Sequence, residues 1–323
     1  MNKDFTCLRD PKNADNFTVL SGQLESTSGN RYPIISGIPR FVDAENYSVD
    51  FGSQWNMFPK TQLDSFSGID VSEARLARCL QGNLAGLKGK LILEAGSGAG
   101  RFTEILLKHG AIVHSFDFSN AVEANANNNG GNENLVLVQA DIRKIPFIKA
   151  SYDYVICLGV LQHTPSPEQS INSLWEMVCP GGALVIDHYP WKWRIVLPPP
   201  FGEALAIYRL INLRLPRKVR FKFVKSLVDF WFPIHWRFRD SGFMQRILRR
   251  ISPVLFYYPH IKLRDRQMYY EWALLDTHDG TTDFYKHRRT VREIKKIIEK
   301  IGATNIVVSP GGNGVEAFCR KPY

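Results

Sequence analysis

Apolar runs alternate with amphipathic segments through the middle of the chain. Because parallel neighbours in a sheet need a crossover connection, strands separated by helices predict a mostly parallel, doubly wound α/β sheet. The apolar runs predict strands at 91–93, 111–116, 135–139, 152–158 and 183–187, and the segments between them predict helices at 101–109, 119–127 and 167–178.

The alternation stops after the fifth predicted strand and resumes about a hundred residues later. A helix is predicted at 291–301, followed by strands at 305–308 and 315–320. A short Gly-rich turn joins these two strands, so we expect an antiparallel hairpin at the sheet edge. A further helix is predicted at 71–87, ahead of the first strand.

These patterns divide the chain into four segments. Pro and Gly break the first fifty residues into short polar stretches, which predicts a small N-terminal stub. The segments are a stub at 1–50, an α/β core at 51–190, a mainly helical insertion after the fifth strand at 191–288, and a helix and hairpin at 289–323 that complete the core.

Composition and charge narrow the function classes. The chain has 323 residues, of which 44% are hydrophobic and 22% charged, which is typical of a globular protein and excludes collagen and coiled coil. Its net charge of +10 is local, because residues 191–262 hold fifteen Lys or Arg and three acids, or 15 − 3 = +12. Anionic partners such as a phosphorylated substrate, a membrane surface or nucleic acid are therefore favoured.

The first ten residues contain no apolar run typical of a secretory signal, and no apolar run approaches the length of a membrane span. We expect a cytoplasmic protein. Its five cysteines are scattered without a C-x-x-C pair, which favours reduced thiols over disulfides or a closed zinc site. No metal is expected.

A Gly-rich loop follows the first core strand, in Leu91-Ile-Leu-Glu-Ala-Gly-Ser-Gly-Ala-Gly-Arg-Phe102. Glycines between a strand and a helix let backbone approach a nucleotide-type cofactor closely. The spacing does not match the dinucleotide fingerprint, since Gly100 arrives one residue early. Glu94 stands just before the loop, where a carboxylate would repel a pyrophosphate and would suit a ligand with a positive charge.

Two further acids follow the next two predicted strands. Asp117 lies at the position of the acid that accepts hydrogen bonds from ribose hydroxyls. Asp141 is placed to meet an adenine amino group, with Ile142 against the ring. An acid after a strand is also a common cap or turn residue. The Gly-rich loop with Glu94, Asp117 and Asp141 follow three successive strands, on the edge where open α/β sheets bind ligands. Together they favour a nucleotide-type cofactor site over caps or turns.

These motifs resemble the class I S-adenosylmethionine-dependent methyltransferases, in particular the subgroup called methyltransferase type 11. The resemblance covers about 88–188 and resumes at about 290–321. It implies a Rossmann-like seven-stranded sheet, closed by an antiparallel hairpin, and S-adenosyl-L-methionine as cofactor. The cofactor-binding residues that it implies are Glu94, Ala95, Gly96, Ser97, Gly98 and Gly100 at the methionine part, Asp117 and Phe118 at the ribose, Asp141 and Ile142 at the adenine, and Leu158 and Gly159 along the methionine side.

The N-terminal residues are similar to a zinc-ribbon-like stub that precedes some of these enzymes, through the segment Tyr32 to Pro39. That stub usually carries two C-x-x-C pairs, but here Cys7 stands alone with Asp10 at the partner position, so no zinc is predicted. Trp55 belongs to a segment that folds over the cofactor in this subgroup. Ordinary packing is the alternative for this ring.

Methyl transfer from a sulfonium is an in-line displacement, so such an enzyme chiefly aligns its reactants. A base is needed only where the acceptor keeps its proton. His163, just beyond the fourth strand, is the candidate base, and a structural histidine bonded to a loop carbonyl is the alternative. The polar loop predicted at 276–287 adds Asp276, His278 and Tyr285 as acceptor-site candidates, with capping and solvation as their alternative.

The basic, aromatic-rich segment 191–262 is predicted to form a lid with helical stretches at 221–232 and 244–251. Three interpretations stay open: a packed cap with solvated Arg and Lys, a patch that contacts membrane lipid peripherally, and an RNA-binding surface. The predicted function is methyl transfer to a hydroxyl, with an amine as second choice, of a small molecule, sugar or lipid-linked glycan. RNA methylation and a non-catalytic scaffold are the alternatives, and the oligomeric state stays open.

Overall fold

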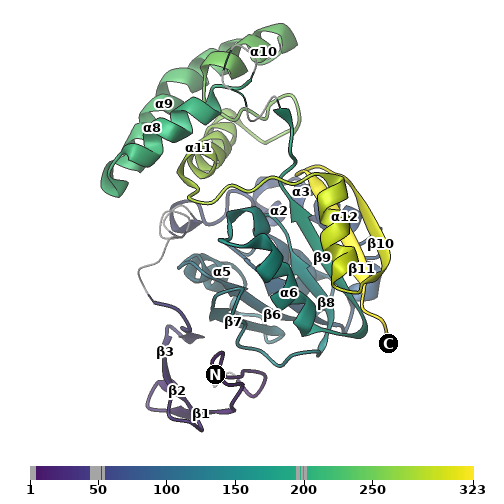
Figure 1. Ribbon diagram of the computed structural model, residues 1–323. Helices are drawn as coiled ribbons and strands as arrows, with labels where there is room; N and C mark the ends of the chain where they lie inside the picture. The colour runs from purple at the N-terminus through teal and green to yellow at the C-terminus, as the bar shows by residue number, and fades with distance from the viewer. Residues whose placement is uncertain (1–4, 44–51, 53–54, 194–196, 198, 200–201) are drawn as a thin grey trace.

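The computed structural model describes residues 5–43, 52, 55–193, 197, 199 and 202–323. A seven-stranded sheet with helices on both faces forms its centre (Figure 1). The strands lie in the order β10-β11-β9-β8-β5-β6-β7. They are β5 (Leu91–Ala95), β6 (Ile112–Asp117), β7 (Leu135–Gln139), β8 (Tyr152–Cys157), β9 (Val178–His188), β10 (Thr304–Pro310) and β11 (Val315–Arg320).

Strands β5 to β9 pair in parallel, and β11 pairs antiparallel with both β9 and β10. The predicted doubly wound sheet with a C-terminal antiparallel hairpin is therefore confirmed. The strand order reverses between β5 and β8, and open α/β sheets bind ligands at such a switch point.

Short helices cover the sheet because its central strands β5 to β9 are largely buried on both faces. Ser166 caps one helix by accepting a hydrogen bond from the Gln169 N–H, and a capping box of Thr290 and Glu293 begins another. These helices are α2 (Asp64–Ser67), α3 (Val71–Cys79), α4 (Arg101–Lys108), α5 (Val122–Asn129), α6 (Pro167–Met177) and α12 (Val291–Lys300), with 3₁₀ turns at Ala85–Leu87 and Leu161–His163.

Several element boundaries differ from the prediction, and three of the differences follow. Helix α3 ends at Cys79 because Gln81 and Gly82 take positive φ values of 56° and 84°. Strand β9 begins at Val178, five residues earlier than the sequence indicates. Ser119 does not begin a helix, because its hydroxyl donates to Asp117 and accepts from the Ala121 N–H.

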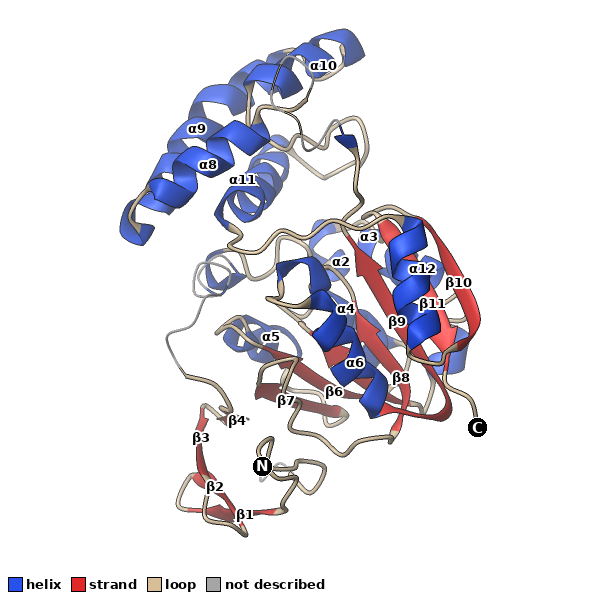
Figure 2. Cartoon of the chain, viewed as in Figure 1, coloured by secondary structure: helices blue, strands red, loops and turns tan. Residues whose placement is uncertain are grey.

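The N-terminal segment folds into its own antiparallel sheet (Figure 2). Asp10 is buried in this segment, where its carboxylate accepts hydrogen bonds from the Tyr32 hydroxyl at 2.8 Å and the Asn30 amide at 2.7 Å. Among the described residues, no group of three or more His, Cys, Asp or Glu side chains is placed to hold a metal ion. The strands are β1 (Phe17–Leu20), β2 (Gln23–Ser26), β3 (Arg31–Ile35) and β4 (Ile38–Pro39).

The insertion is helical, as predicted, and forms a separate layer. Figures 1 and 2 show α8, α9 and α10 on the far side of α11 from the sheet. Aromatic and aliphatic side chains, among them Val228, Phe232 and Trp272, hold α9 against α11. The helices are α8 (Leu205–Arg214), α9 (Arg217–Arg237), α10 (Gly242–Ile251) and α11 (Arg266–Thr282).

The polar loop predicted at 276–287 is wrong for its first half, because α11 runs through Thr282. Asp265 caps the start of this helix by accepting a hydrogen bond from the Met268 N–H. Near its end, the hydroxyls of Thr281 and Thr282 donate to carbonyls one turn earlier. Polar residues that look loop-like in sequence are thus accommodated in a helix.

Candidate functional site

A cavity of about 450 Å³ lies at the carboxyl ends of the parallel strands, between the sheet and the insertion. Its floor is formed by the loop after β5 and by residues that follow β6, β7 and β8. Its other wall comes from α11 and from the segments that flank the insertion helices. This volume falls within the range of small-molecule and cofactor sites.

The loop after β5 needs glycine at two positions that line the cavity. Gly96 and Gly98 take φ values of 77° and 53°, which side-chain-bearing residues rarely adopt. A Cβ on Gly96 would lie 2.3 Å from Val160 Cγ2, and one on Gly98 would lie 3.4 Å from the Trp55 ring. The loop therefore presents bare backbone to the cavity, with the Trp55 ring beside it.

Asp117, at the end of β6, is held by three donors. One oxygen accepts from the Gly98 N–H at 2.9 Å, and the other accepts from the Ser119 N–H at 2.8 Å and its hydroxyl at 2.7 Å. Burial raises the pKa of this carboxyl. Because each carboxylate oxygen has two lone pairs, Asp117 keeps the capacity to accept a hydrogen bond from a ligand hydroxyl in the cavity that it lines.

Asp141 also lines the cavity, but Arg143 occupies much of its carboxylate. The guanidinium donates to both oxygens, at 2.6 Å through Nη2 and at 3.0 Å through Nε. A ligand amino group would therefore share Asp141 with Arg143. The remaining predicted cofactor residues on the cavity wall are Trp55, Gly96, Ser97, Gly98, Phe118, Ile142, Leu158 and Gly159.

Glu94 lies beneath the loop and, like Ala95 and Gly100, is not among the described residues that line the cavity. Its carboxylate accepts hydrogen bonds from Thr103 at 2.5 Å and Ser115 at 2.8 Å, and burial raises its pKa to about 7. The structure thus uses Glu94 to tie α4 and β6 together under the loop. Both hydrogen bonds use Oε2, and Oε1 has no partner among the described residues, so direct contact of Glu94 with the cofactor stays a prediction.

The acceptor end of the cavity contains His163. Its Nδ1 lies 3.3 Å from the carbonyl oxygen of Tyr285 and 3.6 Å from Asp283 Oδ2. Both neighbours accept hydrogen bonds, so they favour the tautomer with its proton on Nδ1 and a lone pair on Nε2. Burial lowers the pKa of His163 to about 4, which keeps the ring neutral at physiological pH.

Helix α11 contributes two half-buried acids to the same end. Asp276 accepts from Gln62 Nε2 at 2.9 Å and from Trp272 Nε1 at 3.1 Å, and burial raises its pKa to about 6. Asp279 lies one turn further along the helix and also lines the cavity. Burial and then repulsion from Asp283 raise its pKa to about 8.

Asp279 was missed because the segment looks like a loop in sequence. A helix would have placed the acids at 276, 279 and 283 on one face, and that spacing was the available signal. Further cavity residues were missed, among them Gln62 and Arg101. Gln62 accepts from Arg101 Nη1 at 2.6 Å and donates to Asp276, so it orients that acid.

Two predicted acceptor-site side chains are not among the described residues that line the cavity. His278 packs on Phe221, with ring centroids 5.6 Å apart, because two residues along a helix turn it away from Asp276. The Tyr285 ring stacks on His287 at 6.2 Å, and only its carbonyl faces His163. The acceptor-site assignment for these two side chains is therefore not retained.

The cavity residues fit S-adenosyl-L-methionine. Gly96 and Gly98 present bare backbone to the cavity, Asp117 offers a fixed acceptor for hydroxyls, and Ile142 and Phe118 give apolar surface. When bound, this cofactor supplies a methyl group on a positively charged sulfur. A cavity lined by several half-buried acids suits such a charge.

Comparisons with known proteins agree with this geometry. The family described as Methyltransferase domain matches residues 93–186. Ubiquinone biosynthesis O-methyltransferase of Coxiella burnetii is 34% identical over 100 residues, which are 30% of this chain and 43% of that protein. The Azoarcus protein of the same name is 31% identical over 136 residues, 41% of this chain and 56% of the relative. The chain thus matches only about half of the length of these relatives.

Solved structures were also compared. Human N-acetylserotonin methyltransferase has a TM-score of 0.47 at 13% identity, and covers 87% of this chain and 61% of its own. Haemonchus contortus phosphoethanolamine N-methyltransferase 2 has a TM-score of 0.48 at 14% identity, and covers 88% and 62%. Likenesses of this size add nothing to the assignment, which rests on the family match and on the cavity. Residues 93–186, which include the cofactor loop and four of the parallel strands after it, therefore match the family described as Methyltransferase domain.

Proposed function

We propose that this chain transfers the methyl group of S-adenosylmethionine to a hydroxyl group of a small-molecule acceptor. The observation that carries the proposal is one cavity whose walls include both the glycine loop with Asp117 and the half-buried polar groups His163, Asp276 and Asp279. The relatives' printed name, ubiquinone biosynthesis O-methyltransferase, supports oxygen as the methylated atom. Free phenols, sugars and lipid-linked glycans are the acceptor classes to test, with amines second.

The cofactor end is assigned to residues that bind and orient. Asp117 accepts hydrogen bonds from the ribose hydroxyls, while Asp141 and Ile142 meet the adenine. The Trp55 ring, beside Gly98, covers the loop and excludes water from it. Alignment of two bound reactants contributes roughly 7 to 11 kcal/mol to such reactions, so positioning carries most of the catalysis.

The proton of the acceptor hydroxyl is assigned to Asp279, with His163 as the second candidate. Asp279 faces Tyr189, Asp276, Asp283 and Lys286, and of these Tyr189 and Lys286 favour its charged form. With a pKa of about 8, its ionised fraction rises through neutral pH, which suits a general base. His163 is neutral at this pH and can accept a proton at Nε2.

The test is transfer of a radiolabelled methyl group from S-adenosylmethionine to pooled phenol, sugar, lipid-linked glycan and amine acceptors. Asp279→Asn and His163→Gln are compared with His278→Gln, a matched control in which the histidine does not line the cavity. We expect label in an O-methyl product, at least tenfold loss in Asp279→Asn, and a control rate within twofold of wild type. Label only in amines would contradict the proposal. Absence of transfer despite cofactor binding would instead favour a non-catalytic scaffold.

A further inference from the structure

The outer layer of the insertion carries large apolar side chains that are exposed to solvent. Three side chains of α10 point outward at helical spacing: Phe243, Ile247 and Ile251, with Phe243 65% exposed. Helix α8 exposes Ile207, Leu210 and Ile211, with Leu210 54% exposed. Exposed residues of this kind are usually single, so grouping on two helices indicates an interaction surface.

The two helices meet at one end, so we group their exposed side chains. The Ala204 N–H donates to the Arg249 carbonyl at 3.1 Å, and the Tyr208 hydroxyl donates to the Ile251 carbonyl at 3.3 Å. Helix α10 turns its buried side, Gln245 and Leu248, toward the rest of the insertion. We call the six exposed side chains on these two helices the outer apolar face.

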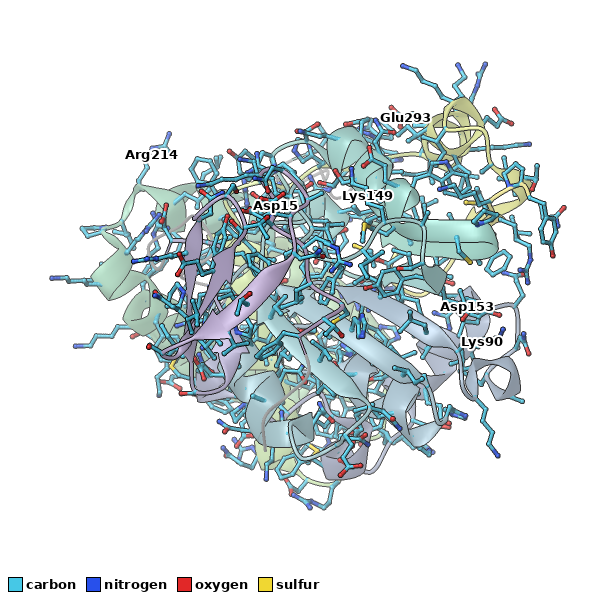
Figure 3. The ribbon with its side chains drawn as sticks, turned by 90° about the horizontal axis from the view of Figure 1, so that it is seen from below. Asp15, Lys90, Lys149, Asp153, Arg214 and Glu293 are labelled. Atoms are coloured by element: carbon cyan, nitrogen blue, oxygen red, sulfur yellow. The ribbon has the colours of Figure 1, made fainter. Side chains whose placement is uncertain are left out.

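Basic side chains surround the outer apolar face. On α10, Arg246, Arg249 and Arg250 are exposed between the apolar positions. At the other end, Arg214 closes α8 and points away from the ribbon into solvent (Figure 3). Among the described residues, none of these four arginines lies within ion-pair distance of a carboxylate. The described basic side chains of the segment 191–262 are mostly exposed.

We propose that the outer apolar face and its arginines dock the protein on an anionic phospholipid bilayer. Basic side chains meet the lipid phosphates, while Ile, Leu and Phe enter the boundary with the acyl chains. The docking would be peripheral, since none of the described helices combines the length and apolar character needed to cross a bilayer. The inference does not rest on the proposed methyl transfer.

The kind of apolar side chain favours lipid over RNA. RNA-binding surfaces use rings that stack on bases, yet five of the six side chains of the outer apolar face are aliphatic. An aliphatic side chain gains little against a base and gains fully in hydrocarbon.

The test is sedimentation of the full chain with vesicles of phosphatidylcholine alone or of equal parts phosphatidylcholine and phosphatidylglycerol. Wild type is expected to bind the mixed vesicles at least tenfold more tightly. Arg246→Gln with Arg250→Gln should weaken this binding about 25-fold, at about fivefold per basic residue. The matched control, Lys296→Gln with Lys300→Gln, removes two charges at the same spacing from α12, and should stay within twofold.

A second pair, Phe243→Ser with Ile247→Ser, tests the apolar contribution and should weaken binding at least tenfold. Thermal unfolding and S-adenosylhomocysteine binding should match wild type in every variant, because all of these side chains are exposed. Equal losses in the control pair, or no binding to either vesicle, would overturn the proposal. So would binding of single-stranded RNA without vesicle binding, or a solution dimer that the apolar pair converts to monomer.

Discussion

Substitution of Gly96 by alanine isolates the geometry of the cofactor loop. The φ of 77° costs an alanine about 1–2 kcal/mol, since left-handed backbone brings Cβ near the following carbonyl. The new Cβ would also lie 2.3 Å from Val160 Cγ2 and 2.8 Å from its Cγ1, and overpacking of this kind costs about 1–3 kcal/mol. We therefore expect Gly96→Ala to lower the free energy of unfolding by about 2–5 kcal/mol.

The two contributions can be separated with Val160→Ala, which removes both clashing methyl groups. The double variant should be more stable than the sum of the single changes by about 1–3 kcal/mol, and the remaining loss should reflect the backbone alone. Urea unfolding followed by fluorescence measures each term. Gly131→Ala is the matched control, since a Cβ there meets nothing within 4 Å, and its effect should stay within about 0.5 kcal/mol. A loss below 1 kcal/mol in Gly96→Ala, or additive changes in the double variant, would refute this account of the loop.

Three further predictions concern buried charge. Glu94 has a folded pKa of about 7, above its unfolded value of 4.5, so the native state loses stability as pH rises between these values. Glu94→Gln should remove this loss, and its free energy of unfolding in urea should rise above that of wild type by up to about 3 kcal/mol between pH 5 and pH 8. A flat difference would contradict it. His163 has a folded pKa of about 4, below its unfolded value of 6.5, so the protein loses stability as pH falls between these values. Near pH 4, His163→Gln should therefore be more stable relative to wild type by up to about 3 kcal/mol. Equal acid sensitivity of the two proteins would contradict this prediction. Asp283 is buried between Arg209 Nε at 2.7 Å and Lys286 Nζ at 2.8 Å, so Asp283→Asn should cost about 3–5 kcal/mol in thermal or urea unfolding, and a cost under 1 kcal/mol would show that these cations find other partners.

The strands and the glycine loop could be predicted because their signals are local. The apolar run at Leu91, the Gly-rich turn and Asp117 follow from residues adjacent in sequence, and all three lie where expected. The placement of Glu94 could not be predicted in this way. Its hydrogen bonds come from Thr103 and Ser115, which approach it only after α4 packs on the sheet.

The residues at the proposed acceptor end could not be predicted, because the sequence does not indicate that α11 continues to Thr282. Thr, Gly and Asp between 276 and 283 favour a loop by propensity, but the packing of Trp272 and its neighbours in the insertion core continues α11 through this segment. This difference moves His278 off the cavity wall and brings Asp279 onto it. Tertiary burial thus decided which polar residues reach the acceptor site.

Calorimetric titration with S-adenosylhomocysteine tests the central claim most directly. Wild type should bind one molecule per chain. Asp117→Ala should weaken this binding at least 100-fold, because the loop and the ribose lose hydrogen bonds to a charged acceptor that are each worth about 1.5–3 kcal/mol. Asp240→Ala, at an exposed acid outside the cavity, should bind like wild type. Absence of binding to a folded wild type, or equal affinity in Asp117→Ala, would contradict the assignment of this cavity to the methyl donor.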